Sequence, residues 1–504
     1  MIGLLILSLA QTPKFDLPES AALAGVSLDL PGVGFGNPGT GSFLEIQYGG
    51  NSFRLPSTDP KVLEWRDDLI QLDVPDDARS GRIRVHTPLG ISPFLKVDVF
   101  EYQWFDIPPT PGTNASPLAI TVGPDHRVWV NQEFHLDFQM LDPAVGSVTG
   151  LPIPKPPNPG PFASTIFSDH RTQTSSLGED ILVDPQGRVW FSQGGGYLYS
   201  GAHPNHSRVV CYDPAAPAGT EYRVYNLPGD WNEAIGLAWD SARGRMWVTN
   251  GGLTSGAKIA SFDPEQLPWD NHFAFDVSLK NQICRPGNPI SDCWQVFELP
   301  NPTSQPAHLL VHPNGDIWYT AYWGNAIGRL KPETGLIEEF PLPAAIGTAP
   351  PVWVVGSGPW QILLGPNDDV FFCEFFDSTV GRFRISRLGD PACLQLNAQG
   401  RNPCIGEIVV PDVDLEHHQM HSIAFDGEGR LWFTQHTGRD QLDSTATLGF
   451  VTADGAAMVL LPSLAEFDLD DAPSAAGIAI DPVTQDIWFS EFWRQRIGLF
   501  KRVP

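Results

Sequence analysis

The chain has 504 residues, more than one ordinary hydrophobic core accommodates, so we expect more than one domain. Only 18% of the residues are charged, whereas 49 Gly and 48 Pro accompany 42% hydrophobic residues, which is typical of many turns between short strands. The formal net charge of −27 opposes contact with phosphate backbones and anionic lipid, so we expect no nucleic-acid partner and no membrane-surface partner.

The first ten residues, MIGLLILSLA, form a short apolar segment that ends in small side chains. We expect residues 1–10 to be a signal peptide whose basic start is missing from this sequence. A buried N-terminal strand is the alternative. No other apolar run approaches the ~20 residues that a membrane span needs, so we expect no membrane span. The expected location is therefore secreted, periplasmic or on the cell surface.

The six cysteines fit this location. Cys284 and Cys293 bracket one polar loop, and Cys393 and Cys404 bracket another, so two local disulfides are predicted. Cys211 and Cys373 lie within apolar strands and are expected to be buried thiols.

Residues 11–100 are expected to form a small β-sandwich, because strands of alternating polarity lie between Gly-rich turns. The alternation is clear in residues 69–74 and 82–86. The segment resembles an IPT/TIG immunoglobulin-like domain, and the resemblance is carried by Gly34, Phe35, Gly36, Trp65, Asp67, Ile70, Val74, Pro75, Gly81, Val85, Thr87, Gly90 and Ser92. It implies an adhesive or spacer module of a secreted protein.

A repeat of four short apolar runs begins after this segment, and residues 306–343 are its clearest copy. The second run of each copy carries an aromatic mark: Trp129, Trp190, Trp247, Trp318, Phe371, Trp432 and Trp488. These marks are expected to be core. Seven such units predict a seven-bladed β-propeller over residues 101–504. Only two strands fit after the last mark, so residues 102–109 are predicted to complete the last blade and close the ring. A solenoid is the alternative.

Ligands usually bind at the central channel of a propeller. One set of side chains stands three residues after each mark: Gln132, Gln193, Asn250, Ala321, Glu374, Gln435 and Glu491. We expect this set to lie near one mouth of the channel. Hydrogen bonding between blade ends is the alternative reading of this set.

A second set stands at the entry of the innermost strands: Asp180, His308, Gln361 and His421. Glu416, His417, His418, Gln419 and His421 form a dense cluster in the sixth copy, and His436 lies on the next strand. Histidine exchanges protons near neutral pH and binds metals, so His421 and His436 are the catalytic candidates.

The repeat resembles that of the streptogramin B lyase (virginiamycin B lyase) family, best in residues 317–320, 325–330 and 337–343. The resemblance covers about 400 residues and implies a seven-bladed propeller that opens a cyclic depsipeptide by magnesium-assisted elimination. Under it, Gln419, His421 and His436 fall at the three positions expected around the metal. The full catalytic set is absent, because Trp360 stands where a basic His is expected.

Two functions remain. The first is an exported lyase- or lactonase-type enzyme that acts on a cyclic ester or peptide-like substrate with Mg²⁺ or another divalent cation. His421 is then the base, and His436, Glu374 and Glu491 lie near the substrate or metal. The second is a non-catalytic propeller that binds a small molecule, peptide, glycan or protein at its channel mouth.

Overall fold

The computed structural model describes the chain in segments: residues 12–39, 41–108, 116–132, 137–153, 180–193, 208–227, 234–251, 256–266, 294–343, 356–377, 379–409, 418–437, 447–452, 455, 458–461, 475–492 and 494–504. For His418 and His436, the structure describes the backbone but not the side chain. The predicted signal peptide, Glu416, His417 and the predicted Cys284–Cys293 disulfide lie outside the described residues.

The N-terminal part is a sandwich of two sheets. The first sheet contains β1 (Lys14–Phe15), β3 (Ser27–Val33), β7 (Leu69–Asp73) and β6 (Val62–Trp65), in that order. The second contains β10 (Leu95–Asp106), β8 (Gly81–Thr87), β4 (Phe43–Tyr48) and β5 (Asn51–Pro56), with β2 (Glu19–Leu23) on β10 and β9 (Gly90–Ile91) on β8. Alternate side chains such as Leu30, Ile70 and Val85 are fully buried between the sheets. The IPT/TIG resemblance of this sandwich stays a prediction.

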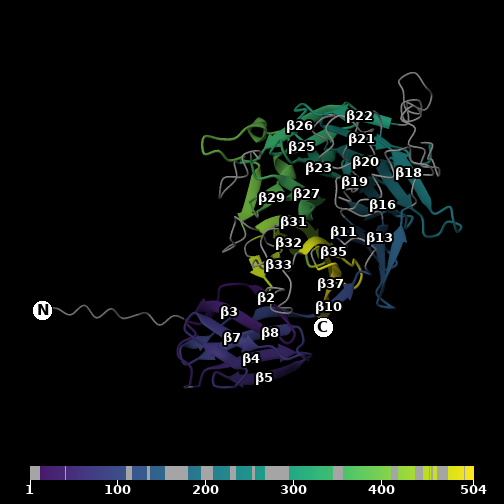
Figure 1. The fold of residues 1–504 in the computed structure, drawn as a ribbon. Helices are drawn as coiled ribbons and strands as arrows, with labels where there is room; N and C mark the ends of the chain where they lie inside the picture. The colour runs from purple at the N-terminus through teal and green to yellow at the C-terminus, as the bar shows by residue number, and fades with distance from the viewer. Residues whose placement is uncertain are drawn as a thin grey trace.

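Six four-stranded sheets follow, each with its strands in chain order (Figure 1). The first sheet contains β11 (Pro117–Val122), β12 (Val128–Gln132), β13 (Asp137–Asp142) and β14 (Ser147–Pro152). The second contains β15 (Ile181–Val183), β16 (Val189–Gln193), β17 (Arg208–Tyr212) and β18 (Tyr222–Asn226). The third contains β19 (Ala234–Asp240), β20 (Arg245–Asn250), β21 (Lys258–Phe262) and β22 (Trp294–Glu298). The fourth sheet contains β23 (Pro306–Val311), β24 (Ile317–Ala321), β25 (Ala326–Lys331) and β26 (Leu336–Pro341). The fifth contains β27 (Pro359–Leu364), β28 (Val370–Glu374), β29 (Thr379–Phe383) and β30 (Ile405–Val409). The sixth contains β31 (His418–Phe425), β32 (Leu431–Thr437), β33 (Thr447–Val451) and β34 (Met458–Leu460).

A seventh array consists of β35 (Ala475–Ile480), β36 (Ile487–Glu491), β37 (Arg496–Val503) and β10. The described residues otherwise contain only three 3-10 turns, η2 (Pro366–Asp368), η3 (Ile385–Arg387) and η4 (Pro391–Leu394). None of the helices found in the described segments has the length and apolarity to span a membrane. The prediction of an all-β propeller is confirmed.

A glycine makes the turn between β23 and β24 possible. Gly315 adopts a φ of 90°, which side chains with a Cβ rarely tolerate. Its N–H donates to the carbonyl of His312 at 2.8 Å. The chain thus reverses between β23 and β24.

Strand β10 supplies the last strand of the seventh array. Its residues Val99 to Asp106 pair antiparallel with β37, and Trp104 lies opposite Gly498. The hydroxyl of Ser490 in this array donates to the carbonyl of Leu118 in the first sheet at 2.7 Å, so the last sheet adjoins the first. β10 is continuous from the sandwich into the ring, and the boundary predicted at residue 100 therefore falls inside one strand.

The marks of the repeat are core residues, as predicted. Trp190, Trp247, Trp318 and Trp432 have no exposed surface. Trp190 packs with Met246 of the neighbouring sheet. Each Trp thus fills the space between two sheets, which excludes water from the sides of the ring.

Buried charges join the sandwich to the ring. Asp98 of β10 is 1% exposed and makes ion pairs with Arg430, Arg502 and Lys96. Phe100 lies two residues further along β10, on the same face as Asp98. It contacts the ring of Trp432 edge-on, with centroids 5.6 Å apart. The two parts therefore meet through a strand that belongs to both.

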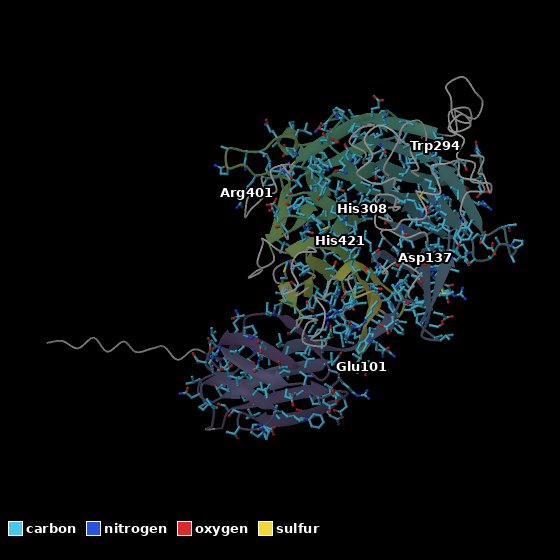
Figure 2. All side chains as sticks on the ribbon, viewed as in Figure 1. Glu101, Asp137, Trp294, His308, Arg401 and His421 are labelled. Carbon is cyan, nitrogen blue, oxygen red and sulfur yellow. A yellow bond between two sulfur atoms is a disulfide. The ribbon has the colours of Figure 1, made fainter. Side chains whose placement is uncertain are left out.

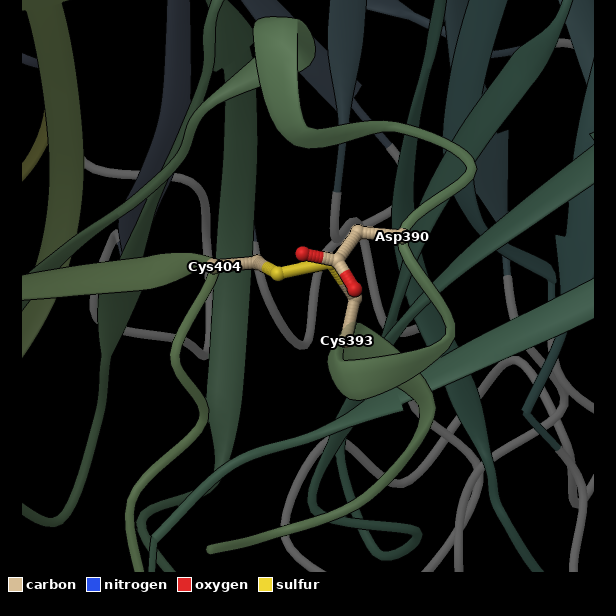
Figure 3. Close-up of side chains that lie close together, drawn as sticks. All are labelled: Asp390, Cys393 and Cys404. Atoms are coloured by element: carbon tan, nitrogen blue, oxygen red, sulfur yellow. A yellow bond between two sulfur atoms is a disulfide. The ribbon is translucent and has the colours of Figure 1, made fainter.

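The disulfide between Cys393 and Cys404 forms as predicted (Figure 3). It closes the loop that separates β29 from β30. Cys211 and Cys373 are buried free thiols, also as predicted.

Candidate functional site

A β-bulge occurs at the head of the innermost strand in most of the sheets. In β23, Pro306 lies opposite Ala321 and Leu309 opposite Tyr319, so one extra residue is inserted on the inner strand. Similar register shifts occur between Pro117 and Ile120, Ala234 and Leu237, Pro359 and Ile362, Met420 and Ser422, and Ala475 and Ile478. Bulges re-aim side chains, and here they do so at the heads of the blades.

The strand register changes which head residues are equivalent. The sequence grouped His421 with His308. Leu309 pairs with Tyr319 and Ile423 with Phe433, so Ser422, not His421, corresponds to His308. His421 corresponds instead to Trp360. Both lie one residue closer to the start of their strands than the position that His308 occupies in β23.

A belt of short polar side chains holds the heads in place. These side chains stand two residues after each mark and bond to a carbonyl of the next sheet. The bonds run from Asn131 to Asp180 (3.3 Å), Thr249 to Ala307 (2.6 Å), Thr320 to Trp360 (2.6 Å), Cys373 to His421 (3.6 Å), Thr434 to Ala476, and Ser490 to Leu118 (2.7 Å). This belt was not predicted from the sequence, although a small polar residue or Cys two places after each mark was a visible signal.

His308 is the best-defined titratable side chain at the heads. It is 7% exposed, and its Nδ1 lies 3.5 Å from Oδ2 of Asp180, two sheets away. The same Oδ2 accepts the N–H of Leu237 at 2.8 Å, so the carboxylate is fixed in position. Nε2 of His308 is buried and has no hydrogen bond within the described part of the chain. A buried ring nitrogen of this kind calls for a polar partner beyond the described residues, which a bound ligand can supply.

Half-buried aromatic rings lie beside His308. The ring of Trp360 is 5.2 Å from that of His308, 5.2 Å from that of Tyr322 and 6.0 Å from that of His421, between centroids. Phe375 lies 6.0 Å from both Trp360 and His421. In Figure 2, His308 and His421 lie toward the middle of the ring. We call Tyr322, Trp360 and Phe375 the aromatic wall, which sequence reasoning did not assign to the site.

The set predicted three residues after each mark is buried throughout, and the hydrogen-bond partners of its members lie mostly in the same sheet. Gln132 donates to Asp137 at 2.9 Å, Arg208 donates to Gln193, and Asn250 donates to the carbonyl of Gly256 at 3.1 Å. Ala321 and Gln435 have no exposed surface. These contacts lie within single sheets and do not join neighbouring blade ends, so both the channel role and the hydrogen-bonding alternative for this set stay predictions.

The two acidic members of the set differ in their surroundings. Tyr102 of β10 donates to Oε1 of Glu491 at 2.7 Å. Glu374 is 2% exposed, and one of its oxygens has no hydrogen bond to a described residue. Burial raises the pKa of Glu374 well above its usual range, and the nearby carboxylates of Glu407 and Asp377 add to the shift. Its buried surroundings therefore favour the protonated form of Glu374.

The residues predicted around a metal are placed only in part. Gln419 pairs with His436 across β31 and β32, and His421 lies in the bulge that follows. The side chain of His436 is not described, so its approach to His421 stays a prediction.

The described side chains do not supply a metal site at the heads. Among them, one group of three potential ligands lies close enough together for a shared ion: Asp390, Cys393 and Cys404 (Figure 3). Its two sulfurs are joined in the disulfide, so they are not thiolate ligands. The predicted Mg²⁺ stays a prediction, and we derive no chemical step through it.

Fold and site together define an all-β propeller with a histidine–carboxylate pair and an aromatic wall at the heads of its inner strands. No protein-family model matches the chain, and no curated protein matches it. Among solved structures, the chain is similar to a streptogramin B lyase, with a TM-score of 0.52, 18% identity, and 80% of this chain and 98% of that chain covered.

It is also similar to a catalytically inactive virginiamycin B lyase from Staphylococcus aureus solved with quinupristin, with a TM-score of 0.51, 19% identity, and 80% and 99% of the two chains covered. The selenomethionine form of that lyase gives the same values. The family resemblance seen in the repeat is thus confirmed at the level of the fold.

Proposed function

We propose that the chain is an exported propeller protein that binds a cyclic ester or peptide-like molecule at the heads of its inner strands and opens it by lyase- or lactonase-type chemistry. The observation that carries the proposal is the buried Nε2 of His308, which no described residue bonds and which is backed by Asp180 and flanked by the aromatic wall.

His308 has the surroundings that a general base needs. A carboxylate next to Nδ1 favours the tautomer that carries its proton on Nδ1, which leaves Nε2 free to accept one. Nε2 can then remove a proton next to a carbonyl, so that an ester oxygen leaves, or it can activate water for attack on the ester. His421, across Trp360, is the second candidate for proton transfer.

The aromatic wall supports a ligand with apolar or ring-shaped surfaces. Tyr322, Trp360 and Phe375 offer flat faces beside the two histidines. Aromatic faces bind rings and apolar groups with modest directionality, whereas a few polar groups fix orientation. The fold similarity to a lyase solved with quinupristin makes cyclic peptide-like esters the first class to test.

The test is incubation of the full chain with quinupristin and with a panel of simpler lactones, with and without Mg²⁺, followed by mass spectrometry. Elimination opens the ring without a change in mass, whereas hydrolysis adds one water, so the two reactions are distinguished. His308→Gln should abolish turnover, and His126→Gln, in a turn of the first sheet, is the matched control. Turnover that survives His308→Gln would refute His308 as the base.

A non-catalytic binding protein is the second candidate. The observation that favours it is the incomplete set around the expected metal, where Trp360 replaces a basic histidine. Saturable binding of a panel member that depends on Trp360, with no change in that ligand, would support this candidate over the enzyme.

A further inference from the structure

A cavity of about 500 Å³ lies inside the N-terminal sandwich, away from the propeller channel. Leu28 and Leu72 line it from one sheet, and Ile46, Leu55 and Val97 line it from the other. Ligand pockets usually occupy roughly 300–1,000 Å³. A space of this size is unusual beside a closely packed core, and the apolar part of its lining between the sheets does not suit water.

Two connections and an aromatic pair form the rim. Tyr48 and Phe53 stack with their centroids 5.0 Å apart, and Phe53 is 45% exposed. Lys61 belongs to the connection between β5 and β6, and Asp77 and Arg79 belong to the connection between β7 and β8. The rim is thus polar and aromatic, whereas the interior is apolar.

The charges at the rim are available to a ligand. Lys61, Asp77 and Arg79 make no ion pair with any described residue, and Arg79 is exposed. Asp59 accepts the backbone N–H of Lys61 at 3.0 Å. Arg54 also lines the cavity, and its guanidinium lies over the ring of Phe43. With Arg82, Asp59 and Asp73, the lining holds four cations and three carboxylates, so the rim favours a negative head group even though the chain as a whole is strongly acidic.

We propose that the sandwich binds a single-chain amphiphile, with its alkyl chain between the two sheets and an anionic head between Lys61 and Arg79. The occupant also supports the junction with the propeller. Val97 and Val99 of β10 line the cavity, whereas the alternate residues Asp98 and Phe100 contact the propeller. A ligand that fills the cavity therefore packs against the strand that both parts share.

The test is calorimetric titration of the full chain with dodecanoate, dodecyl phosphate, dodecanol and dodecylamine. One molecule of dodecanoate or dodecyl phosphate should bind per chain and raise the unfolding temperature with concentration, because the ligand binds only the folded state. Dodecylamine should bind at least about tenfold more weakly. Arg79→Gln should weaken binding of the two anions about tenfold and leave dodecanol unchanged. Preference for the amine, or no binding of either anion, would overturn the proposal.

Ala78→Phe separates this cavity from adventitious adsorption, because Ala78 lines the rim and its replacement by Phe fills the entrance. It should abolish binding, whereas Ala144→Phe, in an exposed turn of the first propeller sheet, should bind like the wild type. Equal binding by Ala78→Phe and the wild type would refute the site. His308→Gln should bind dodecanoate like the wild type, because His308 lies in the propeller. A failure of the proposed propeller function is therefore distinguishable from a failure of dodecanoate binding at this cavity.

Discussion

Asp180 is the residue on which the geometry of the candidate site most depends. Its Oδ2 accepts the N–H of Leu237 and lies next to His308, so one carboxylate connects three sheets. Its Oδ1 also accepts the N–H of Ile181 at 2.8 Å. Removal of a buried acceptor leaves its donors unsatisfied, which costs more than the bond itself contributed.

Asp180→Ala should therefore lower the free energy of unfolding by about 1–3 kcal/mol, measured by denaturant titration. Asp73→Ala, at an exposed strand end, is the control and should change it by no more than about 0.5 kcal/mol. An equal effect of both substitutions would show that Asp180 does not join the sheets.

Glu374 gives a prediction about pH. Its pKa is raised in the folded chain because the side chain is buried and lies near Glu407 and Asp377. A raised carboxyl pKa contributes stability that is fully present below the unfolded pKa of 4.5 and is lost as the pH rises through the folded value. Glu374→Gln keeps the neutral form at every pH, so it should stabilise the chain at about pH 8 and change little at about pH 4.

Thermal unfolding of Glu374→Gln and the wild type at the two pH values measures this difference. Glu101→Gln, on an exposed position of β10, is the control, and Glu101 is labelled in Figure 2. A stabilisation that is the same at both pH values would contradict a raised pKa of Glu374.

At the scale of the elements, the bulges and the polar belt act together. Thr320 accepts the N–H of His308 at 3.0 Å and donates to the carbonyl of Trp360 at 2.6 Å. One hydroxyl thus holds the bulge of its own sheet and the head of the next sheet. The belt fixes the backbone from which His308 and Trp360 project.

Thr320→Val keeps the shape of the side chain and removes the hydroxyl. It should lower the free energy of unfolding by about 1–3 kcal/mol, because a buried N–H and a buried C=O lose their partner. It should also weaken any ligand held by His308 or Trp360. Thr149→Val, on an exposed position of β14, should do neither. Denaturant titration and ligand titration of both variants check the two effects.

At the scale of the whole molecule, the charged cluster around Asp98 joins the sandwich to the propeller. Burial opposes ionisation of Glu428, but hydrogen bonds from Lys96 and Arg502 and the charge of Arg430 hold its pKa at about 2. Stability from a lowered carboxyl pKa is present above the unfolded value of 4.5 and is lost as the pH falls toward 2. Glu19 opposes this trend, because burial raises its pKa.

The contact between the sandwich and the propeller should therefore weaken as the pH falls from about 4.5 to about 2, before the closely packed ring unfolds. Limited proteolysis, or hydrogen exchange of β2 and β10, measures this loosening. Glu428→Gln should remove much of its acid dependence. Loss of the ring and of the junction at one pH in both proteins would argue against a separate electrostatic contribution.

The sequence allowed prediction of the repeats and of the closing strand, because turn residues such as Gly315 and marks such as Trp318 are local signals. The pair of Asp180 and His308 was not predictable, since 128 positions separate two residues that only the closed ring brings together. The offset between His421 and His308 was missed for another reason. A bulge adds one residue without changing the local pattern of apolar positions.

The central claim is that the heads of the inner strands bind a ligand through the aromatic wall and His308. Crystallographic screening of the full chain with aromatic and cyclic-ester fragments tests it most directly. Fragments should gather against Trp360, Tyr322 and Phe375, with a polar atom within hydrogen-bond distance of Nε2 of His308. Fragments that bind repeatedly elsewhere, while the aromatic wall and His308 bind none, would contradict the account.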